Sequence, residues 1–310
     1  EEFYFDSRDG ENRIHAVRYT PDDGNVRGIV QIVHGMAEYV ERYENLAEFL
    51  TKRGILVTGE DHLGHGKSVS EGGSFGYFCE QDPATVVVRD VHRLKKITEE
   101  QYPQVPYIIL GHSMGSFIAR NYLCRYGSGI GGAVIVGTGM QPAGLIFASK
   151  AMAGIQKLFC GSKHVSHFID KAAFGGYNKR IDSPRTSSDW LSRNTENVDR
   201  YIADELCGFT FTVNGFQTLF ELIRRLQKQE NLEKVPQNLP ILMVSGAEDP
   251  VGDYGKGVHK ACDSLKRAGV KNITVKLYEN DRHELLNEDD AEVAMEDIWQ
   301  WICKEIPGIA

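Results

Sequence analysis

The sequence predicts an α/β fold with a doubly wound, mostly parallel sheet that begins with an antiparallel pair of strands. Three observations lead to this prediction. Short apolar runs rich in β-branched residues alternate with helical periodicity along most of the 310 residues. These runs do not alternate with polar residues, which is typical of parallel strands buried on both faces. Residues 3–5 and 14–19 do alternate, on either side of the turn residues Asp9-Gly10, and predict an antiparallel hairpin.

The remaining elements follow in strand–helix order. Strands are expected at residues 29–33, 55–57, 107–110, 133–136, 241–244 and 273–277. Helices are expected at residues 43–53, 85–101, 114–126, 216–231, 256–268 and 292–306. This order predicts one large sheet with helices on both faces.

One interval interrupts this order. Residues 141–206 contain no strand run, but their apolar residues recur at helical spacing. We expect a mostly helical cap over the carboxyl ends of the strands, where α/β sheets bind ligands. The expected division is therefore a core of residues 1–140 and 207–310, with residues 141–206 as the inserted cap.

Composition excludes several classes of protein. A net charge of -8 argues against a general affinity for nucleic acid. The six cysteines are dispersed without a C-x-x-C pair, which favours reduced thiols in a cytoplasmic protein over disulfides or a zinc site. No apolar run is long enough to span a bilayer, and residues 1–3 show no start of a signal peptide.

The clearest chemical motif is Gly111-His112-Ser113-Met114-Gly115, which matches G-x-S-x-G between a predicted strand and a predicted helix. In that context the serine lies on a tight, strained turn that exposes its hydroxyl. Side chains at Gly111 and Gly115 would collide with the neighbouring strand and helix. Ser113 is therefore the predicted nucleophile.

A serine nucleophile needs a base, and the expected chain order is serine, acid, histidine. His283 follows the last strand run, at a carboxyl end of the sheet, and is the predicted general base. Asp249 and Glu248 both follow the preceding strand run. We favour Asp249, which the following proline holds in an extended loop, and Glu248 stays the alternative.

The oxyanion of an acyl-transfer intermediate needs two backbone N–H donors. Met114, directly after the nucleophile, is one candidate. Met36, in the loop His34-Gly35-Met36 after a predicted strand, is the other. His34 is expected to brace this loop. Residues 61–68 carry an aspartate and two histidines, for which loop bracing is favoured over a metal site. No nucleotide-binding or calcium-binding motif is present, so neither a cofactor nor a metal is expected.

Together, His34-Gly35, Asp61 with Gly64-His65-Gly66, the Ser113 motif, Asp249 and His283 resemble the α/β-hydrolase superfamily. More narrowly, the chain resembles the monoacylglycerol lipase and lysophospholipase branch, which is grouped with the serine aminopeptidases S33. The resemblance implies an eight-stranded core with a helical cap, and ester hydrolysis by Ser113, Asp249 and His283 with Met36 and Met114 as oxyanion donors. Members of the branch commonly have histidine after the glutamate of this loop, where the chain has Tyr39.

The expected substrate is a monoacylglycerol or lysophospholipid, a small lipid ester, and the cap is expected to contact a membrane or micelle transiently. Esters of short-chain or aromatic acids, and an aminopeptidase activity, are the alternatives. A non-catalytic ligand-binding relative is the least favoured. Six apolar cap residues are candidates for an acyl tunnel, and packing within the cap is an equally weighted interpretation: Leu145, Ile146, Phe147, Met152, Leu158 and Phe159.

Overall fold

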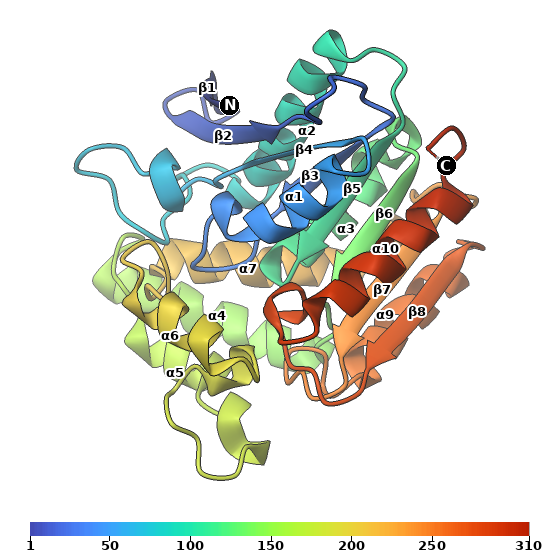
Figure 1. Ribbon diagram of the computed structural model, residues 1–310. Coiled ribbons are helices and arrows are strands. Elements are labelled where there is room, and N and C mark those ends of the chain that lie inside the picture. The colour runs from blue at the N-terminus through green and yellow to red at the C-terminus, as the bar shows by residue number, and fades with distance from the viewer. Residues whose placement is uncertain (310) are drawn as a thin grey trace.

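An eight-stranded sheet runs through the centre of the molecule in the computed structural model, which describes residues 1–309 (Figure 1). Its strands are β1 (Glu2–Asp6), β2 (Arg13–Tyr19), β3 (Gly28–Val33), β4 (Ile55–Glu60), β5 (Tyr107–His112), β6 (Gly132–Val136), β7 (Ile241–Gly246) and β8 (Ile273–Tyr278). Their spatial order is β1-β2-β4-β3-β5-β6-β7-β8. β2 is antiparallel to β1 and β4, and every other pair is parallel. The predicted fold class, hairpin and strand runs are confirmed.

The five central strands are buried along their whole length, because helices cover both faces of the sheet. α1 (Glu44–Thr51) and α10 (Ala291–Glu305) pack on the face toward the viewer in Figure 1. α2 (Pro83–Gln101), α3 (Met114–Tyr126) and α9 (Lys256–Arg267) pack on the other face. β8 is an edge strand, and its residues before the buried Tyr278 alternate between partly buried and exposed.

One predicted helix differs in the structure. Residues 216–231 are not a single helix: α7 (Val213–Leu226) ends first, and the short α8 (Gln229–Leu232) follows. The break lies at Lys228, whose backbone is extended. The longer α7 packs against α3 and joins the cap to the core.

The part of the chain between β6 and α7 gathers at one end of the molecule (Figure 1). It contains α4 (Ala143–Cys160), α5 (His167–Phe174), α6 (Thr195–Ala203) and the short 3-10 turns Tyr177–Arg180 and Asp189–Leu191. We use the word cap for residues 141–206, and their division from the core stays a prediction. Among residues 1–309, no helix combines the length and apolarity needed to cross a bilayer.

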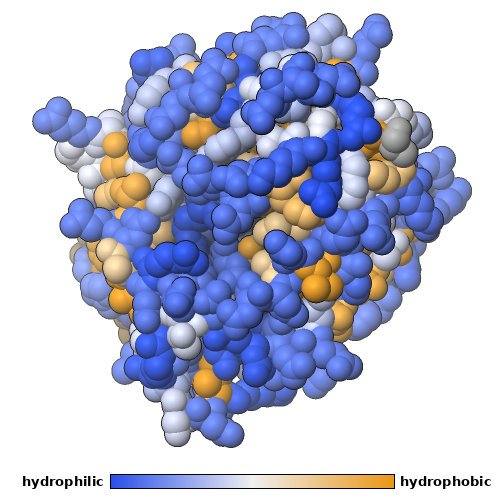
Figure 2. All heavy atoms as spheres, viewed as in Figure 1, coloured by the Kyte–Doolittle hydropathy of each residue, from blue (hydrophilic) through white to orange (hydrophobic). Residues whose placement is uncertain are grey.

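The surface seen in Figure 2 is mostly hydrophilic, and its hydrophobic side chains form small, separate groups. Most large apolar side chains lie instead in the two clusters that sandwich the sheet. These clusters hold the carboxyl ends of the central strands in fixed positions, and the loops after β3, β5, β7 and β8 build the site.

Candidate active site

The turn between β5 and α3 places Ser113 under backbone strain. Ser113 has φ 54° and ψ -122°, a conformation that residues other than glycine rarely adopt. A side chain at Gly115 would collide with the Val33 carbonyl on β3, and one at Gly111 with the Gly115 carbonyl. The predicted reason for both glycines is confirmed, since only they allow the strand, turn and helix to approach this closely.

Three side chains from distant parts of the chain meet at this turn. His283 Nε2 lies 2.7 Å from Ser113 Oγ, and His283 Nδ1 lies 3.0 Å from Asp249 Oδ2. The second oxygen of Asp249 accepts a hydrogen bond of 2.8 Å from the Val251 N–H, which fixes the carboxylate. The structure thus brings together the predicted nucleophile, base and acid in a hydrogen-bonded line.

The other residues that could have served as the acid or the base lie away from Ser113. Glu248 is exposed and pairs at 3.4 Å with Arg193, so Asp249 is the acid that reaches His283. The histidines of the cap, His164 and His167, are exposed, and so is His259 on α9.

The loop after β3 lies against Ser113. A Cβ at Gly35 would be 3.1 Å from the Ser113 Cβ, and Gly35 N donates a 2.5 Å hydrogen bond to Glu38 Oε1. Ala37 has φ 53°, so the turn is held tightly. Within residues 1–309, the N–H groups of Met36 and Met114 donate to no protein acceptor. Met114 is at the first position of α3, where helix N–H groups point outward unpaired.

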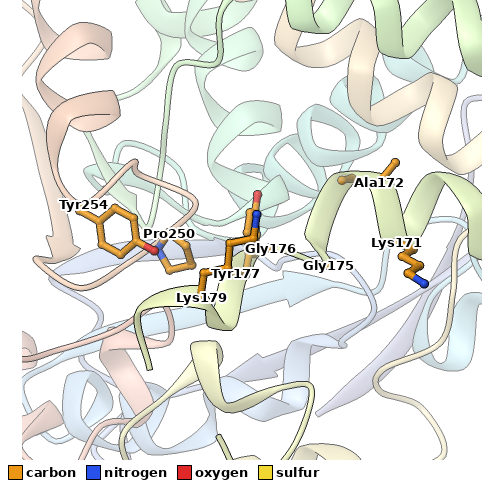
Figure 3. A pocket seen from close by; sticks show the side chains of 9 residues that line it. Lys171, Ala172, Gly175, Gly176, Tyr177, Lys179, Pro250 and Tyr254 are labelled. Carbon is orange, nitrogen blue, oxygen red and sulfur yellow. The ribbon is translucent and has the colours of Figure 1, made fainter. Parts of the chain in front are cut away.

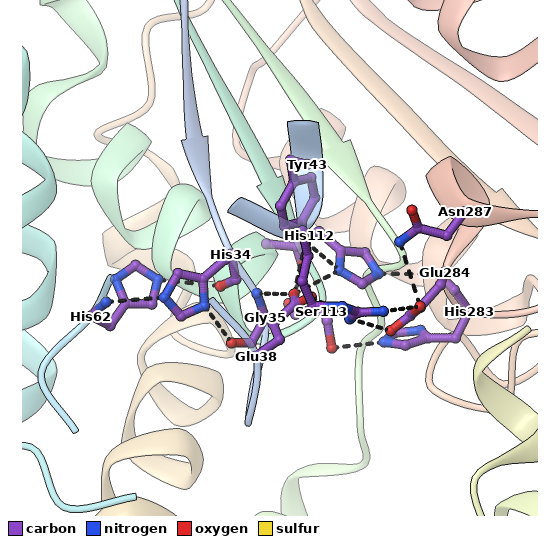
Figure 4. A network of polar contacts seen from close by, with 12 residues as sticks. His34, Gly35, Glu38, Tyr43, His62, His112, Ser113, His283, Glu284 and Asn287 are labelled. Carbon is purple, nitrogen blue, oxygen red and sulfur yellow. Dashed lines mark hydrogen bonds and ion pairs between the residues drawn. The ribbon is translucent and has the colours of Figure 1, made fainter. Parts of the chain in front are cut away.

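A buried charged network lies directly behind these residues (Figure 4). Arg42 donates 2.8 Å hydrogen bonds to Glu38 and to both oxygens of Glu284. His112, beside the nucleophile, lies 3.3 Å from Glu38 through Nδ1 and donates through Nε2 to the His283 carbonyl oxygen at 3.1 Å. The network therefore joins the loop after β3, the nucleophile turn and the His283 loop.

The charges of this network balance one another. Burial opposes ionisation of Glu38, but the His112 hydrogen bond and the Arg42 charge lower the pKa of its carboxyl below the usual range. Burial likewise opposes charge on Glu284, and Arg42 lowers the pKa of that carboxyl. Burial also opposes charge on His112, and the Glu38 hydrogen bond raises its pKa. Since a buried charge is costly without partners, all three groups depend on one another.

Comparison with known proteins identifies the family. The model of the serine aminopeptidase S33 family matches residues 24–290. The chain belongs to this family of α/β hydrolases. The predicted family and the prediction of a hydrolase are both confirmed.

Individual relatives agree with this assignment. The hydrolase is 29% identical to the monoglyceride lipase of Rattus norvegicus over 273 residues, which are 87% of this chain and 80% of the relative. It is 28% identical to the monoacylglycerol lipase of Mycolicibacterium smegmatis over 289 residues, or 93% and 92% of the two chains. A highly thermostable carboxyl esterase from Bacillus coagulans, solved in complex with glycerol, superposes with a TM-score of 0.92 at 31% identity and covers 100% of this chain and 99% of its own.

An aromatic wall from the cap covers one side of the site in this hydrolase. The Trp190 ring centroid lies 5.1 Å from that of His283, and the Tyr177 ring packs edge-on against Trp190 at 4.9 Å. The His112 ring also lies near His283, with the ring centroids 4.8 Å apart. The imidazole thus contacts a ring of the nucleophile turn and a ring of the cap.

A cavity of about 500 Å³ lies next to this wall (Figure 3). It opens between the cap and the loop after β7, beside Asp249. Its lining is mixed in polarity and comprises Lys171, Ala172, Ala173, Gly175, Gly176, Tyr177, Lys179, Pro250 and Tyr254. None of the six predicted acyl-tunnel residues is in this lining.

The six candidate residues for an acyl tunnel differ in how far their side chains are exposed to solvent. Ile146 is buried, and Met152 packs against the main core, which fits packing within the cap. Leu145 is exposed, and Phe147, Leu158 and Phe159 are 77%, 84% and 85% exposed. These four side chains lie on the outer face of α4 and line no closed tunnel in this structure. The sequence could not distinguish the faces of α4, because nearly all of its residues are apolar or small.

The loop after β4 is braced as predicted. Asp61 accepts hydrogen bonds of 2.9 Å from the N–H groups of Val40 and Lys67. The oxygen that accepts from Lys67, Oδ2, also lies 2.8 Å from His15 Nδ1. His34 accepts a 3.0 Å hydrogen bond from the His62 N–H, so the two histidine loops support each other. His15, Glu41 and Asp61 lie close enough to offer metal ligands, but Asp61 is already occupied by these donors.

The sequence analysis predicted neither the charged network around Arg42 nor the aromatic wall of Trp190 and Tyr177. Glu284 directly follows His283, and Glu38 lies two residues after Met36; Arg42, four residues after Glu38, pairs with both carboxylates. Glu38 lies in the loop before the 3-10 turn Val40–Tyr43, so no helical spacing marked this pair in the sequence. No signal marks Trp190 either, because its position depends on the packing of the cap.

Proposed function

We propose that the protein is a serine hydrolase that cleaves carboxylic esters of the monoacylglycerol type through an acyl-enzyme. The observation that carries the proposal is the line of hydrogen bonds from Ser113 Oγ to His283 and on to Asp249. The names of the two lipases and the carboxyl esterase support an ester substrate.

The geometry supports a definite order of proton transfers. Asp249 keeps the proton of neutral His283 on Nδ1, which leaves Nε2 free to accept the Ser113 proton as Oγ attacks the ester carbonyl. The N–H groups of Met36 and Met114 would stabilise the oxyanion. His283 then gives its proton to the leaving alcohol. Water attacks the acyl-enzyme, gives one proton to His283, and releases the acid as that proton returns to Ser113.

The alcohol part of the ester is proposed to leave toward the cavity beside Asp249. His283 protonates the alcohol, so the alcohol must lie on the His283 side of Ser113. The rings of Trp190 and Tyr177 lead from His283 to the cavity lining. Lysine, tyrosine and backbone groups in that lining suit a polar alcohol better than an acyl chain.

A panel of substrates tests this function. Turnover should be highest for monoacylglycerol, compared with lysophosphatidylcholine, a feruloyl ester, an aminoacyl amide and p-nitrophenyl esters from short to long chains. Ser113→Ala should abolish turnover and fluorophosphonate labelling, and Ser187→Ala, an exposed serine of the cap, should retain both. Turnover confined to short chains or to the aminoacyl amide would contradict the lipid substrate. Wild-type turnover in Ser113→Ala would contradict the mechanism.

Transient membrane contact through α4 and a cytoplasmic location also belong to this proposal. The exposed side chains of Phe147, Leu158 and Phe159 support the contact, because an apolar helix face gains free energy by entering a lipid interface. In a co-sedimentation assay with neutral phosphatidylcholine vesicles, we expect the wild type to sediment with the vesicles. A smaller fraction of a Leu158→Ser, Phe159→Ser double variant should do so. Val293→Ser, at an exposed position of α10, is the control. Equal sedimentation of all three proteins would contradict the contact. The cytoplasmic location rests on the dispersed cysteines, all six of which are free thiols.

A further inference from the structure

The loop that carries His283 is fastened to the cap by one buried carboxylate, Glu288. Its Oε2 accepts hydrogen bonds from Ser192 Oγ at 2.7 Å, Arg193 N at 2.8 Å and Asn194 N at 3.3 Å. Its Oε1 accepts a hydrogen bond from Arg282 N at 2.8 Å. Glu288 is only 5% exposed, so its four partners replace the water that a carboxylate would otherwise require.

Both neighbours of His283 in the sequence also bind the cap. The Arg282 guanidinium donates to the carbonyl oxygens of Asp189 at 2.7 Å and Ser192 at 3.1 Å. Glu284 N donates to the Leu191 carbonyl oxygen at 2.6 Å. We name Arg282, Glu288 and residues 189–194 together the clasp. The hydrogen bonds of the clasp therefore hold the His283 loop on both sides of His283 in the sequence.

The clasp also includes the ring that lies against His283. Trp190 stands between Asp189 and Leu191, whose carbonyl oxygens both accept hydrogen bonds from the His283 loop. The segment that holds the loop therefore presents Trp190 to the imidazole at 5.1 Å. A shift of residues 189–194 would move both the loop and the wall.

We propose that Glu288 is a positioning residue for His283, which it holds in line with Ser113 by docking residues 192–194 of the cap onto the His283 loop. Glu288 touches neither the reacting atoms nor His283 itself. Its effect is on distance, because the 2.7 Å contact between His283 Nε2 and Ser113 Oγ depends on where the loop lies. This inference rests on the proposed serine hydrolase function.

The first test replaces the carboxylate with an amide of the same size. In Glu288→Gln, the side-chain NH₂ must face either the three cap donors or the Arg282 N–H, so one side of the clasp is lost. Since a misplacement of 1 Å can reduce a catalysed rate about 100-fold, we expect kcat and the fluorophosphonate labelling rate to fall about 10- to 100-fold. KM should change by less than about threefold, because the Glu288 side chain itself does not contact substrate.

Asp90→Asn is the matched control. Asp90 is equally buried and accepts hydrogen bonds from Ser7 Oγ at 2.8 Å and Arg8 N at 2.6 Å, but it lies on α2 and has no contact with the His283 loop. Its kcat and labelling rate should equal those of the wild type. If Glu288→Gln folds and matches Asp90→Asn in both rates, or if its loss is confined to KM, the proposal is wrong.

Two further measurements keep the proposal testable. Should Glu288→Gln fail to fold, Ser192→Ala removes a single donor of the clasp and should lower the labelling rate to a smaller extent; an unchanged rate overturns the proposal. The downfield proton resonance of His283 Nδ1, bonded to Asp249, should broaden or shift in the clasp variants but not in Asp90→Asn. This resonance needs no substrate. A change in it therefore supports the positioning role even if the wild type hydrolyses no ester, and an unchanged resonance overturns it.

Discussion

Replacing Asp249 with asparagine should disable the hydrolase while leaving it folded. Both oxygens of this carboxylate face donors: Oδ2 faces His283 Nδ1, and Oδ1 accepts the Val251 N–H at 2.8 Å. An amide offers only one acceptor. The backbone N–H of Val251 cannot give up its proton, so the amide oxygen turns to it and the NH₂ group faces His283.

That orientation forces the wrong tautomer on His283. With an NH₂ donor against Nδ1, the imidazole carries its proton on Nε2 and can no longer accept the Ser113 proton. The expected loss in kcat is about 10⁴-fold, the size seen when the orienting acid of such a triad becomes an amide. In contrast, Glu248→Gln alters an exposed side chain and should retain wild-type rates.

Three measurements check this prediction. Turnover of a p-nitrophenyl ester gives kcat, fluorophosphonate labelling reports nucleophile activation, and thermal unfolding reports the fold. Asp249→Asn should show the same Tm within a few degrees, very slow labelling and a kcat near the detection limit. A folded variant that keeps more than a tenth of the wild-type kcat would refute the tautomer argument and the assignment of the acid.

Three further predictions concern stability. Burial, together with the neighbouring His34, lowers the pKa of His65 to about 3, so the stability that neutral His65 contributes is lost as pH falls below 6.5, the ordinary histidine value, by about 2 kcal/mol between pH 7.5 and 5. Urea titrations should show a shallower pH dependence for His65→Leu, and an unchanged slope would contradict this. Burial and two neighbouring carboxylates raise the pKa of Asp281 to about 7, so this group destabilises the fold as pH rises from about 4 to 7. Asp281→Asn should therefore raise the Tm at pH 8 and leave it unchanged at pH 4, and equal shifts at both would count against it. Gly115→Ala, whose Cβ would strike the Val33 carbonyl, should yield no soluble folded protein, and a folded variant would contradict this. Gly154→Ala, at an open position in the middle of α4, should instead stabilise the protein by up to about 1 kcal/mol.

The parts of the site that could be predicted from sequence are those whose structure is set locally. Ser113 stands on a turn that Gly111 and Gly115 encode, and Asp249 and His283 each follow a strand run directly. Because parallel strands end at the same edge of the sheet, a correct strand assignment brings the three residues together without any knowledge of the cap. The fold was predictable for the same reason, since the buried strands are nearly continuous apolar runs.

The contacts between cap and core could not be read in this way. Glu288 binds Ser192, a residue 96 positions earlier, and no periodicity relates the two. The segment 175–194 is held in short turns by local hydrogen bonds, such as those from the backbone of Arg185 and Thr186 to Asp189. Such turns leave little hydrophobic pattern, so the position of Trp190 follows only from the packed structure.

The contact between Ser113 and His283 also has a consequence for how the chain folds. The two residues are 170 positions apart, and the sheet must be complete from β5 to β8 before they can touch. Contacts this distant in sequence are slow to form, and they form after local helices and hairpins. During refolding, fluorophosphonate labelling should therefore recover later than helical circular dichroism. The reactivity of one serine thus reports when the last strand has docked.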